Sequence, residues 1–350
     1  MNIVSIVGAR PQFIKSAPVS RAIIDAGYHE YKIHTGQHYD YEMSQIFFEE
    51  LGLSEPSVNL GIGSGTHAQQ TGQMMMAIEP ILQEQNPDIV LVYGDTNTTL
   101  AGALAAAKLN YKLAHIEAGL RSFNRKMPEE HNRVLTDHCA DLLFCPTSTA
   151  VENLNREGIC KGVHLVGDTM YDAVLQFSEI ATKRSNILKR LLLKPHQYLL
   201  ATIHRASNTD NTNYLSTIFS AFKEINELII FPIHPRTRET IKNAQISIPD
   251  NVKLIDPVGY LDMLVLEQKA RLILTDSGGV QKEAYFFKVP CLTLRTETEW
   301  VETLINGWNY LVGTDYNLIL EKINEHRGLF PETVPFYGEG NASPTIVSLL

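Results

Sequence analysis

The sequence has few cysteines and no long apolar run. Its four cysteines, Cys139, Cys145, Cys160 and Cys291, form no CxxC pair, so we expect reduced core thiols and a cytoplasmic protein. No run of about 18 apolar residues, the length of a membrane-spanning helix, is present. The start of the chain lacks the basic flank of a signal peptide, and residues 2–7 are expected to form a strand.

The chain also has no excess of positive charge. It has 30 Lys and Arg against 39 Asp and Glu, giving a net charge of -9 and a pI near 5.7. This balance argues against non-specific nucleic-acid binding, and any phosphate ligand must be met by local positive charge. The 350 residues, 44% of them hydrophobic, suggest two domains or one large one, with ample core.

The clearest local pattern is an apolar run, a turn and a helical segment at residues 271–284. The turn holds Ser277, Gly278 and Gly279. The start of such a helix offers unpaired N–H groups to an anion, and adjacent glycines let a phosphate approach the backbone. Glu283, about one turn into the helix, could accept hydrogen bonds from a ribose diol. These residues predict a nucleotide diphosphate site. A turn that binds nothing is the alternative, because short glycine motifs are unspecific.

Strands alternate with helices along most of the sequence, which predicts doubly wound α/β domains with parallel sheets. The alternation pauses in a polar, Lys/Arg-rich stretch, where we place the boundary between domains at residues 1–178 and 179–340. Residues 341–350 are expected to form a short helix that packs on the N-terminal domain. A helix at residues 41–51 and a loop at residues 56–66 are also expected.

Polar residues gather where the predicted strands end. In parallel sheets these ends share one edge, where doubly wound folds bind ligands. We therefore expect a cleft between the domains, with acids from the first and a phosphate site from the second. The residues at these ends are Arg10, Gln37, His38, Asp95 and Glu117, followed by His204, Arg205, His234, Arg236, Ser277, Gly278 and Gly279.

The two acids of the first domain each have an ordinary structural explanation. Asp95 could cap a helix N-terminus, a role that Thr96 could fill instead. Glu117 lies between an apolar strand and Ala118-Gly119, where a carboxylate without a partner would be costly. Arg121 could be that partner.

The remaining charged candidates have alternatives too. Arg10 could pair with a surface acid. Glu129 could be only an acid that stabilises the first turn of its helix, or it could pair with Arg133 four residues later. His204 and His234 could be core histidines. Neither belongs to an HExxH or other metal-ligand spacing, so we expect no metal.

The functional interpretation explains the set as a whole. Clustered carboxylates raise one another's pKa values, which provides an acid and a base near neutral pH. Arginine, histidine and a helix N-terminus would stabilise a departing diphosphate.

A series of motifs occurs in a fixed order: GARP at 8–11 with Lys15, GDT at 94–96, HIEAGLR at 115–121, PEEHNR at 128–133, TIHR at 202–205, HPR at 234–236 and LTDSGGVQ at 274–281. The set resembles the non-hydrolysing UDP-N-acetylglucosamine 2-epimerases. The resemblance implies two Rossmann-like domains of the GT-B type, with parallel sheets facing an interdomain cleft. It also implies a homodimer, a UDP-sugar substrate and no cofactor.

The same resemblance implies a mechanism. The C2 proton is removed and UDP departs, which leaves a 2-acetamidoglucal. C2 is then protonated on the opposite face, and UDP adds back. By motif, Asp95, Glu117 and Glu129 are the acid/base groups, and His204 joins Arg10 at the diphosphate. The other implied contacts are Lys15 near the diphosphate, Ser277, Gly278 and Gly279 at the phosphate, Glu283 at the ribose, Val258 and Met263 near the uracil, and Gln37, His38, Arg133 and His234 lining the cleft.

One motif departs from the family pattern. Glu299-Trp300-Val301-Glu302 stands where the common pattern is Glu-Arg-Pro-Glu. This Glu-Trp-Val-Glu is similar to the motif in the branch of the family that acts on UDP-2,3-diacetamido-2,3-dideoxyglucuronic acid. Both this sugar nucleotide and UDP-N-acetylglucosamine are therefore candidate substrates. A hydrolysing 2-epimerase, a GT-B glycosyltransferase and a nucleotide-sugar sensor are the alternatives of other classes.

Overall fold

The structure, a computed structural model, describes residues 1–37, 55–326 and 334–350. These residues form two compact units. Unit 1 comprises residues 1–176 and 335–350, and unit 2 comprises residues 177–334. His38 and the helix expected at 41–51 lie outside the described residues.

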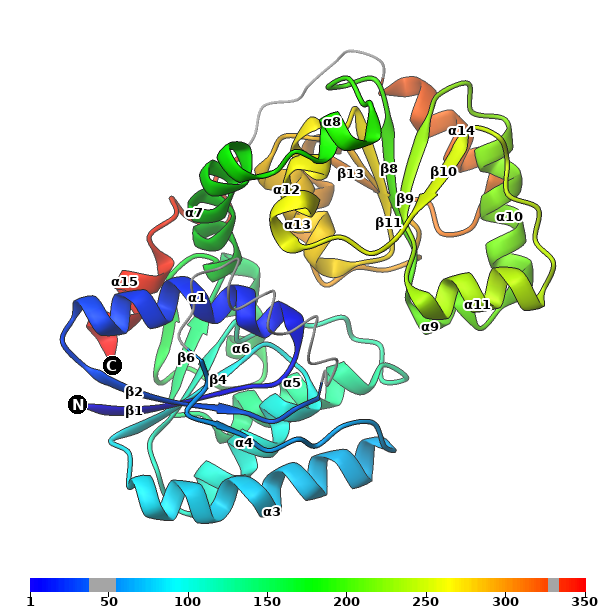
Figure 1. The fold of residues 1–350 in the computed structure, drawn as a ribbon. Coiled ribbons are helices and arrows are strands. Elements are labelled where there is room, and N and C mark those ends of the chain that lie inside the picture. The colour runs from blue at the N-terminus through cyan, green and yellow to red at the C-terminus, as the bar shows by residue number, and fades with distance from the viewer. Residues whose placement is uncertain (38–54, 327–333) are drawn as a thin grey trace. The chain divides into compact units, whose positions relative to one another are not determined.

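Unit 1 is built on a parallel sheet with the strand order β3-β2-β1-β4-β5-β6-β7 (Figure 1). This arrangement confirms the doubly wound sheet predicted from the alternation. The strands are β1 (Asn2–Val7), β2 (His29–His34), β3 (Val58–Asn59), β4 (Ile89–Tyr93), β5 (Leu113–Ile116), β6 (Leu142–Cys145) and β7 (Val163–Leu165). β3 corrects the expectation of a plain loop at 56–66, since two residues there pair with Ile33 and His34 of β2.

Helices cover both faces of this sheet. They are α1 (Arg10–Asp25), α3 (His67–Gln85), α4 (Asn97–Lys108), α5 (Pro128–Cys139), α6 (Ser148–Arg156), α7 (Thr169–Arg184) and the C-terminal α15 (Ala342–Leu349). α3 packs on α4 and α4 on α5, whereas α1 packs on α15 (Figure 1). Small alanines and apolar strand residues make the core between α3, α4 and the sheet.

The chain returns to unit 1 for its last helix. Asp172 of α7 accepts hydrogen bonds from the backbone N–H groups of Ala342 and Ser343, at 3.1 and 2.6 Å. It therefore caps α15 from another helix, which satisfies N–H groups that have no intrahelical partner.

Unit 2 repeats the architecture with the strand order β10-β9-β8-β11-β12-β13. Its strands are β8 (Leu199–Thr202), β9 (Ile229–Pro232), β10 (Val252–Ile255), β11 (Leu272–Thr275), β12 (Cys291–Thr293) and β13 (Asn309–Leu311). Its helices are α8 (Ile187–Leu191), α9 (Ala206–Thr209), α10 (Thr212–Lys223), α11 (Pro235–Asn243), α12 (Tyr260–Lys269), α13 (Gly278–Phe286), α14 (Tyr316–Glu325) and the 3-10 helix η1 (Val301–Gly307). Leucine, isoleucine and phenylalanine side chains fill its core.

Each sheet has a point where the chain direction across the sheet reverses, between β1 and β4 in unit 1 and between β8 and β11 in unit 2. Connections from these strands run to opposite faces and leave a crevice at their carboxyl ends, where doubly wound folds bind ligands. Strand order alone therefore predicts a ligand site at the segments after β1, β4, β8 and β11. Among the described helices, none has the length and apolar character that crossing a membrane requires.

Candidate functional site

The first crevice brings together the segments after β1 and β4. Gln12, which is buried, joins them: its Oε1 accepts from the N–H groups of Gly8 and Ala9, and its Nε2 donates to the Tyr93 carbonyl at 2.8 Å. Arg10 is the first residue of α1 and is half-buried. No local sequence pattern identifies Gln12, because its role depends on packing between distant loops.

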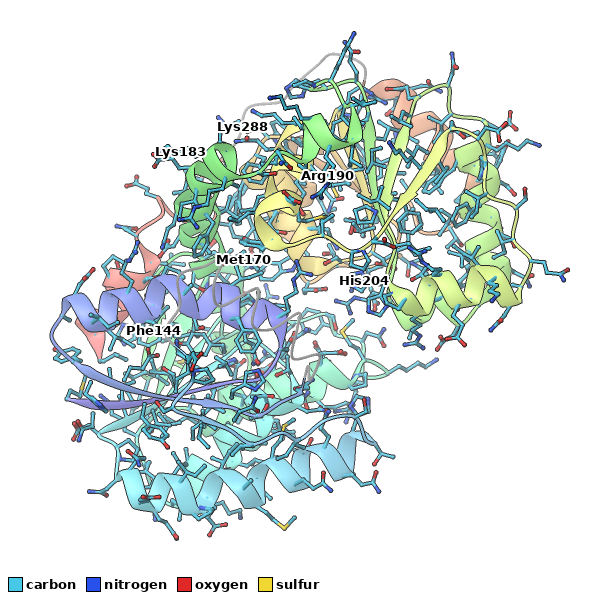
Figure 2. The ribbon with its side chains drawn as sticks, in the orientation of Figure 1. Phe144, Met170, Lys183, Arg190, His204 and Lys288 are labelled. Carbon is cyan, nitrogen blue, oxygen red and sulfur yellow. The ribbon has the colours of Figure 1, made fainter. Side chains whose placement is uncertain are left out.

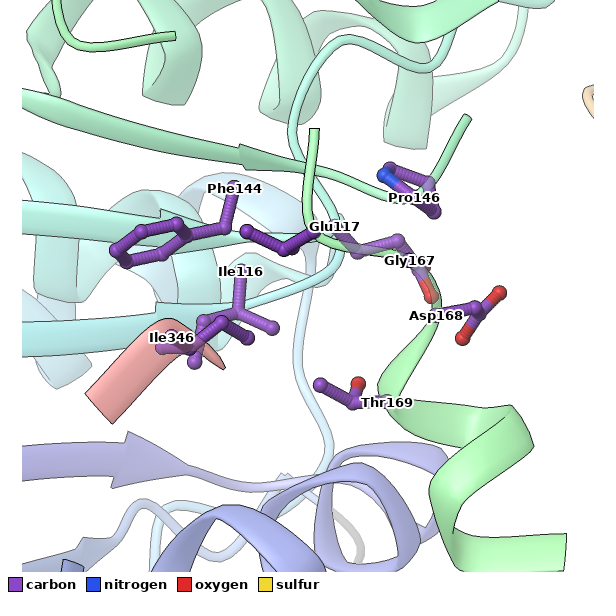
Figure 3. Close-up of a pocket in the computed structure, with 9 residues that line it drawn as sticks. Ile116, Glu117, Phe144, Pro146, Gly167, Asp168, Thr169 and Ile346 are labelled. Carbon is purple, nitrogen blue, oxygen red and sulfur yellow. The ribbon is translucent and has the colours of Figure 1, made fainter. Parts of the chain in front are cut away.

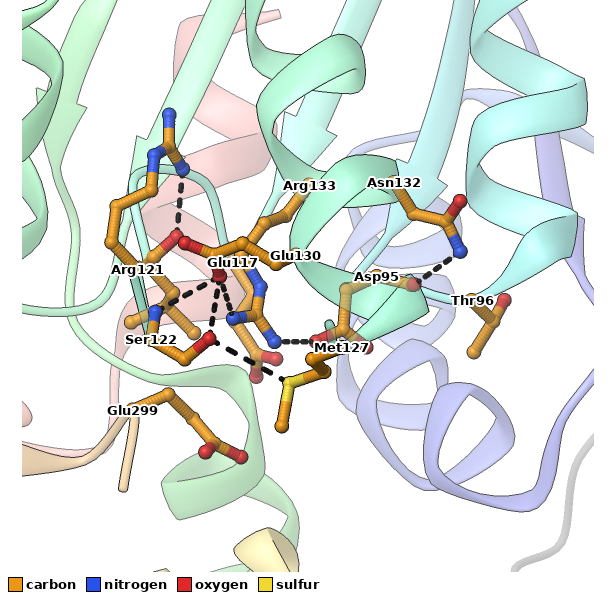
Figure 4. Close-up of polar contacts among 12 residues, drawn as sticks. Asp95, Thr96, Glu117, Arg121, Ser122, Met127, Glu130, Asn132, Arg133 and Glu299 are labelled. Carbon is orange, nitrogen blue, oxygen red and sulfur yellow. Dashed lines mark hydrogen bonds and ion pairs between the residues drawn. The ribbon is translucent and has the colours of Figure 1, made fainter. Parts of the chain in front are cut away.

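Asp95 follows β4 and is held from α5. The Arg133 guanidinium donates to Asp95 Oδ2 at 2.5 Å, and Asn132 Nδ2 donates to the Asp95 carbonyl at 3.0 Å (Figure 4). The Asp95 side chain keeps 30% of its surface exposed. Thr96, not Asp95, caps α4, so capping does not explain the acid.

Glu117 follows β5 and is buried, with a backbone φ of 73°. Its Oε1 lies 2.6 Å from the Nζ of Lys15, which is also buried. A Cβ on Gly94 would lie 3.6 Å from both of these atoms, so the ion pair lies against the residue that precedes Asp95. Lys15 is therefore bound to an acid of the site. The suggestion that Arg121 pairs with Glu117 is wrong, because Arg121 binds Asp137 and Glu157 instead.

Glu129 and Glu130 begin α5 but have different surroundings. Glu129 is half-buried, and among the described residues its carboxylate makes no hydrogen bond or ion pair. The alternative that Glu129 pairs with Arg133 is wrong, because the Arg133 guanidinium pairs with Glu130 and Asp95 (Figure 4).

The Glu130 carboxylate holds the loop before α5. It accepts hydrogen bonds from Ser122 N, Ser122 Oγ and Phe123 N at 2.8–2.9 Å. Burial works to raise the pKa of Glu130, but these hydrogen bonds and the charge of Arg133 outweigh it, and the pKa lies below its ordinary value. Glu130 is therefore an ionised anchor of the loop.

Gln37 lies at the same crevice. Its Oε1 accepts hydrogen bonds from the N–H and the hydroxyl of Thr98, at 3.1 and 2.8 Å. A small pocket opens beside Glu117, between the end of β5, the segment before α7 and the last helix (Figure 3). Its wall combines Asp168 and Thr169 with Phe144 and Ile346. Unit 1 thus gathers Arg10, Lys15, Gln37, Asp95, Glu117 and Arg133 around the ends of its central strands.

The second crevice begins with α13, which starts directly after β11. Ser277 is its N-cap residue, and within the described residues its hydroxyl makes no capping hydrogen bond. A Cβ on Gly278 would come within 2.6 Å of Glu299 Oε1 and 3.1 Å of Trp300 Nε1. A side chain at position 278 would therefore require the Glu299 carboxylate to move away from this helix start, whose N–H groups and dipole favour an anion.

Asp276 fixes the neighbouring loop after β8. This buried carboxylate accepts from the N–H groups of His204 and Arg205 at 3.0–3.1 Å and from Asn208 Nδ2 at 3.0 Å. The His204 side chain projects from this loop with 45% of its surface exposed (Figure 2). One acid thus ties together the adjacent ends of β8 and β11.

His234 lies beside His204, with 6.4 Å between the ring centroids. Its Nδ1 accepts from the Arg236 N–H and caps α11. Burial, together with the nearby His204 and Arg236, lowers the pKa of His234 below its ordinary value. His234 therefore favours the neutral form, with its proton on Nε2.

The predicted nucleoside residues lie on α12 and α13. Glu283 is buried, and its Oε1 accepts a hydrogen bond from Tyr260 at 3.0 Å. Val258 lies just before α12 and Met263 within it, both half-buried. Trp300, which stands where the family pattern has arginine, is buried, with Lys282 Nζ 3.7 Å from its ring centroid.

Residues 24–350 match the protein family described as UDP-N-acetylglucosamine 2-epimerase. The chain is 57% identical to a UDP-N-acetylglucosamine 2-epimerase homolog of Methanococcus maripaludis, over 100% of this chain and 99% of that protein. It is 48% identical to the UDP-2,3-diacetamido-2,3-dideoxy-D-glucuronate 2-epimerase of Pseudomonas aeruginosa, again over 100% and 99% of the two chains.

Among solved structures, the fold is similar to that of the Methanocaldococcus jannaschii UDP-GlcNAc 2-epimerase in complex with UDP-GlcNAc and UDP. The TM-score is 0.94 at 46% identity, covering 100% of this chain and 99% of that one.

Proposed function

Because the chain belongs to the UDP-N-acetylglucosamine 2-epimerase family, we propose that it interconverts UDP-GlcNAc and UDP-ManNAc without hydrolysis, for surface polysaccharide precursors. The family and the predicted parallel α/β fold are confirmed by the comparisons.

The reaction begins with removal of the C2 proton by a carboxylate. The C1–O bond to UDP breaks, the electron pair leaves with the UDP oxygen, and a C1=C2 double bond forms. UDP then adds back to C1 as a proton is delivered to C2 from the opposite face. A base, an acid and an anion site are required, and no hydride or metal takes part.

The observation that carries the proposal is the placement of Asp95 and Glu117 at the carboxyl ends of the neighbouring strands β4 and β5. Asp95 is in contact with Arg133 and Glu117 with Lys15. Each acid therefore has a cation beside it. The cation stabilises the ionised form of that acid, before it takes up a proton or after it gives one up. Glu129 is the third acid/base candidate.

Unit 2 supplies groups suited to the departing UDP. We assign the diphosphate to the start of α13 at Ser277, Gly278 and Gly279 and to His204, with Arg10 of unit 1 as a further contact. Glu283 would take the ribose, while Val258 and Met263 would flank the uracil. Gln37, His38, Arg133 and His234 would line the substrate site.

Two sugar nucleotides are candidate substrates. The 57% identical relative is named for UDP-N-acetylglucosamine, and the 48% identical relative from Pseudomonas aeruginosa for the diacetamido-glucuronate. We favour UDP-GlcNAc, since the structurally similar Methanocaldococcus jannaschii enzyme was solved with that sugar nucleotide. We also propose a cytoplasmic homodimer.

A side-by-side assay in D2O tests the function. Each UDP-sugar is incubated with the purified chain, and proton NMR follows the C2 epimer and deuterium at C2. We expect UDP-GlcNAc to yield UDP-ManNAc with deuterium at C2. Faster turnover of the diacetamido-uronate would reassign the substrate, and no C2 exchange with either sugar would refute the 2-epimerase. Stoichiometric release of free UDP would indicate a hydrolysing enzyme.

A further inference from the structure

A buried carboxylate lies beneath the loops that carry the two proposed acid/base residues. Asp137 of α5 is 1% exposed. Its Oδ2 accepts from the Gly119 N–H at 3.1 Å and from the Arg121 guanidinium at 2.7 Å, and its Oδ1 lies 2.7 Å from His115 Nδ1. Asp137 faces no solvent, and the proposed mechanism assigns it no role.

The contact with Gly119 bears on the Glu117 loop. Glu117 and Gly119 have backbone φ angles of 73° and 81°, in the left-handed region. A non-glycine residue held there stores about 1–3 kcal/mol and persists only when its surroundings fix it. The Phe144 carbonyl, which accepts from Glu117 N and Ala118 N, fixes one side of this turn. Asp137 fixes the other side through Gly119.

The contact with His115 bears on the Asp95 loop. His115 is buried in β5, and its Nε2 lies 2.7 Å from the Gly94 carbonyl. That carbonyl can only accept, so Nε2 is the donor. Asp137 orients the imidazole through Nδ1, and the imidazole holds the peptide group between Gly94 and Asp95.

Asp137 is suited to this task because its charge persists. Burial works to raise the pKa of Asp137, but the hydrogen bond and charge of His115 and the charge of Arg121 outweigh it, and the pKa lies below its ordinary value. Hydrogen bonds to an ionised carboxylate are shorter and stronger than neutral ones, so the ionised form holds both loops more firmly.

We infer that Asp137 is a positioning residue that sets both acids of unit 1, Glu117 through Gly119 and Asp95 through His115. The inference rests on the proposed 2-epimerase function. Asp137 touches no reacting atom; it acts by fixing two peptide segments. A displacement of about 1 Å at a reacting group can reduce a rate about 100-fold, so loosening these segments should reduce the chemical step.

Asp137→Asn is the test variant, because it keeps the size of the side chain but removes the carboxylate charge, so that the charge-assisted hydrogen bonds to Gly119, Arg121 and His115 are weakened. Glu157→Gln is its matched control. Glu157 binds the same Arg121, at 2.7 Å, but contacts neither Gly119 nor His115, and its side chain is 27% exposed. His115→Asn is a second variant, which shortens the side chain and releases the Gly94 carbonyl while keeping Asp137.

Three measurements are made on each folded variant: the rate of C2 deuterium incorporation, the UDP dissociation constant by calorimetry, and amide hydrogen exchange by mass spectrometry. We expect Asp137→Asn to lower kcat about 10- to 100-fold, with UDP affinity within about twofold of wild type. Deuterium uptake should rise in peptides covering residues 95–97 and 118–120. Glu157→Gln should change none of these readings, and His115→Asn should raise uptake at 95–97.

A kcat of Asp137→Asn within threefold of wild type would overturn the inference, and so would an equal loss of kcat in Glu157→Gln. If Asp137→Asn does not fold, unchanged uptake at 95–97 in His115→Asn would overturn it. Absence of C2 exchange in the wild-type enzyme would instead refute the proposed function. The hydrogen-exchange comparison would then still decide whether Asp137 holds the two loops.

Discussion

The ion pair between Lys15 and Glu117 allows the stability of unit 1 to be separated from its chemistry. The pair is short, at 2.6 Å, and its side chains are only 9% and 6% exposed. Removing one partner of a buried pair leaves the other charge without compensation and typically costs about 3–5 kcal/mol. Because both ends retain slight exposure, we expect Lys15→Met and Glu117→Gln each to cost about 3 kcal/mol.

The double variant Lys15→Met/Glu117→Gln removes both charges. Additive effects would cost about 6 kcal/mol, but no unpaired charge remains, so we expect a cost at least about 1 kcal/mol below that sum. The free energy of unfolding is measured by urea denaturation for the wild type, the single variants and the double variant. Lys183→Met is the control for losing a lysine, because its partner Glu179 is exposed and the pair should contribute little.

Activity should not follow stability in this cycle. If Glu117 moves the C2 proton, Glu117→Gln lowers the rate of C2 deuterium exchange about 10²- to 10⁴-fold. The double variant should regain stability and remain inactive. If the losses in unfolding free energy of the two single variants simply add in the double variant, the two side chains do not interact, which would contradict the geometry of the pair. Exchange by the double variant within threefold of wild type would contradict the acid/base role of Glu117.

Three further predictions concern other parts of the molecule. Asp95→Asn should lower C2 exchange about 10²- to 10⁴-fold with UDP affinity unchanged; exchange within threefold of wild type would remove Asp95 from the mechanism. Gly278→Ala places a Cβ 2.6 Å from Glu299 Oε1; the added methyl group and the shifted Glu299 carboxylate at this helix start should weaken UDP binding about tenfold, and calorimetry giving wild-type affinity would argue against a phosphate there. Burial raises the pKa of Asp172 above 3.8, so the folded state binds that proton more tightly than the unfolded state. The free energy of unfolding should therefore fall as pH rises from 3.8 through the raised pKa, and urea midpoints should show Asp172→Ala losing this slope; an unchanged slope would exclude Asp172 as its source.

The sequence predicted the architecture because periodicity and breakers act locally. The alternation of apolar runs and helical segments predicted both parallel sheets, and their order put Asp95, Glu117, His204 and Ser277 at strand ends. The two residues of β3 were missed because so short a strand depends on pairing with β2 and has no periodic signal of its own.

Side-chain partners were predicted less well, because they depend on packing between distant segments. Lys15 and Glu117 are 102 residues apart, and no sequence pattern links them, so Arg121 was a plausible but wrong partner. Asp137 has no local motif that distinguishes it from a surface acid of α5. Asp276 could have been recognised, because a carboxylate directly after a buried strand and before a glycine turn needs donors, and here the loop after β8 provides them.

The central claim is that loss of the C2 proton is coupled to departure of UDP. It is tested directly with a UDP-sugar carrying oxygen-18 in the bond between C1 and the β-phosphate, incubated with the enzyme in D2O. Elimination frees that oxygen to exchange places with the other β-phosphate oxygens before UDP returns. We predict that oxygen-18 moves to non-bridging positions as deuterium appears at C2. Deuterium at C2 with all oxygen-18 still in the bridge would contradict the account.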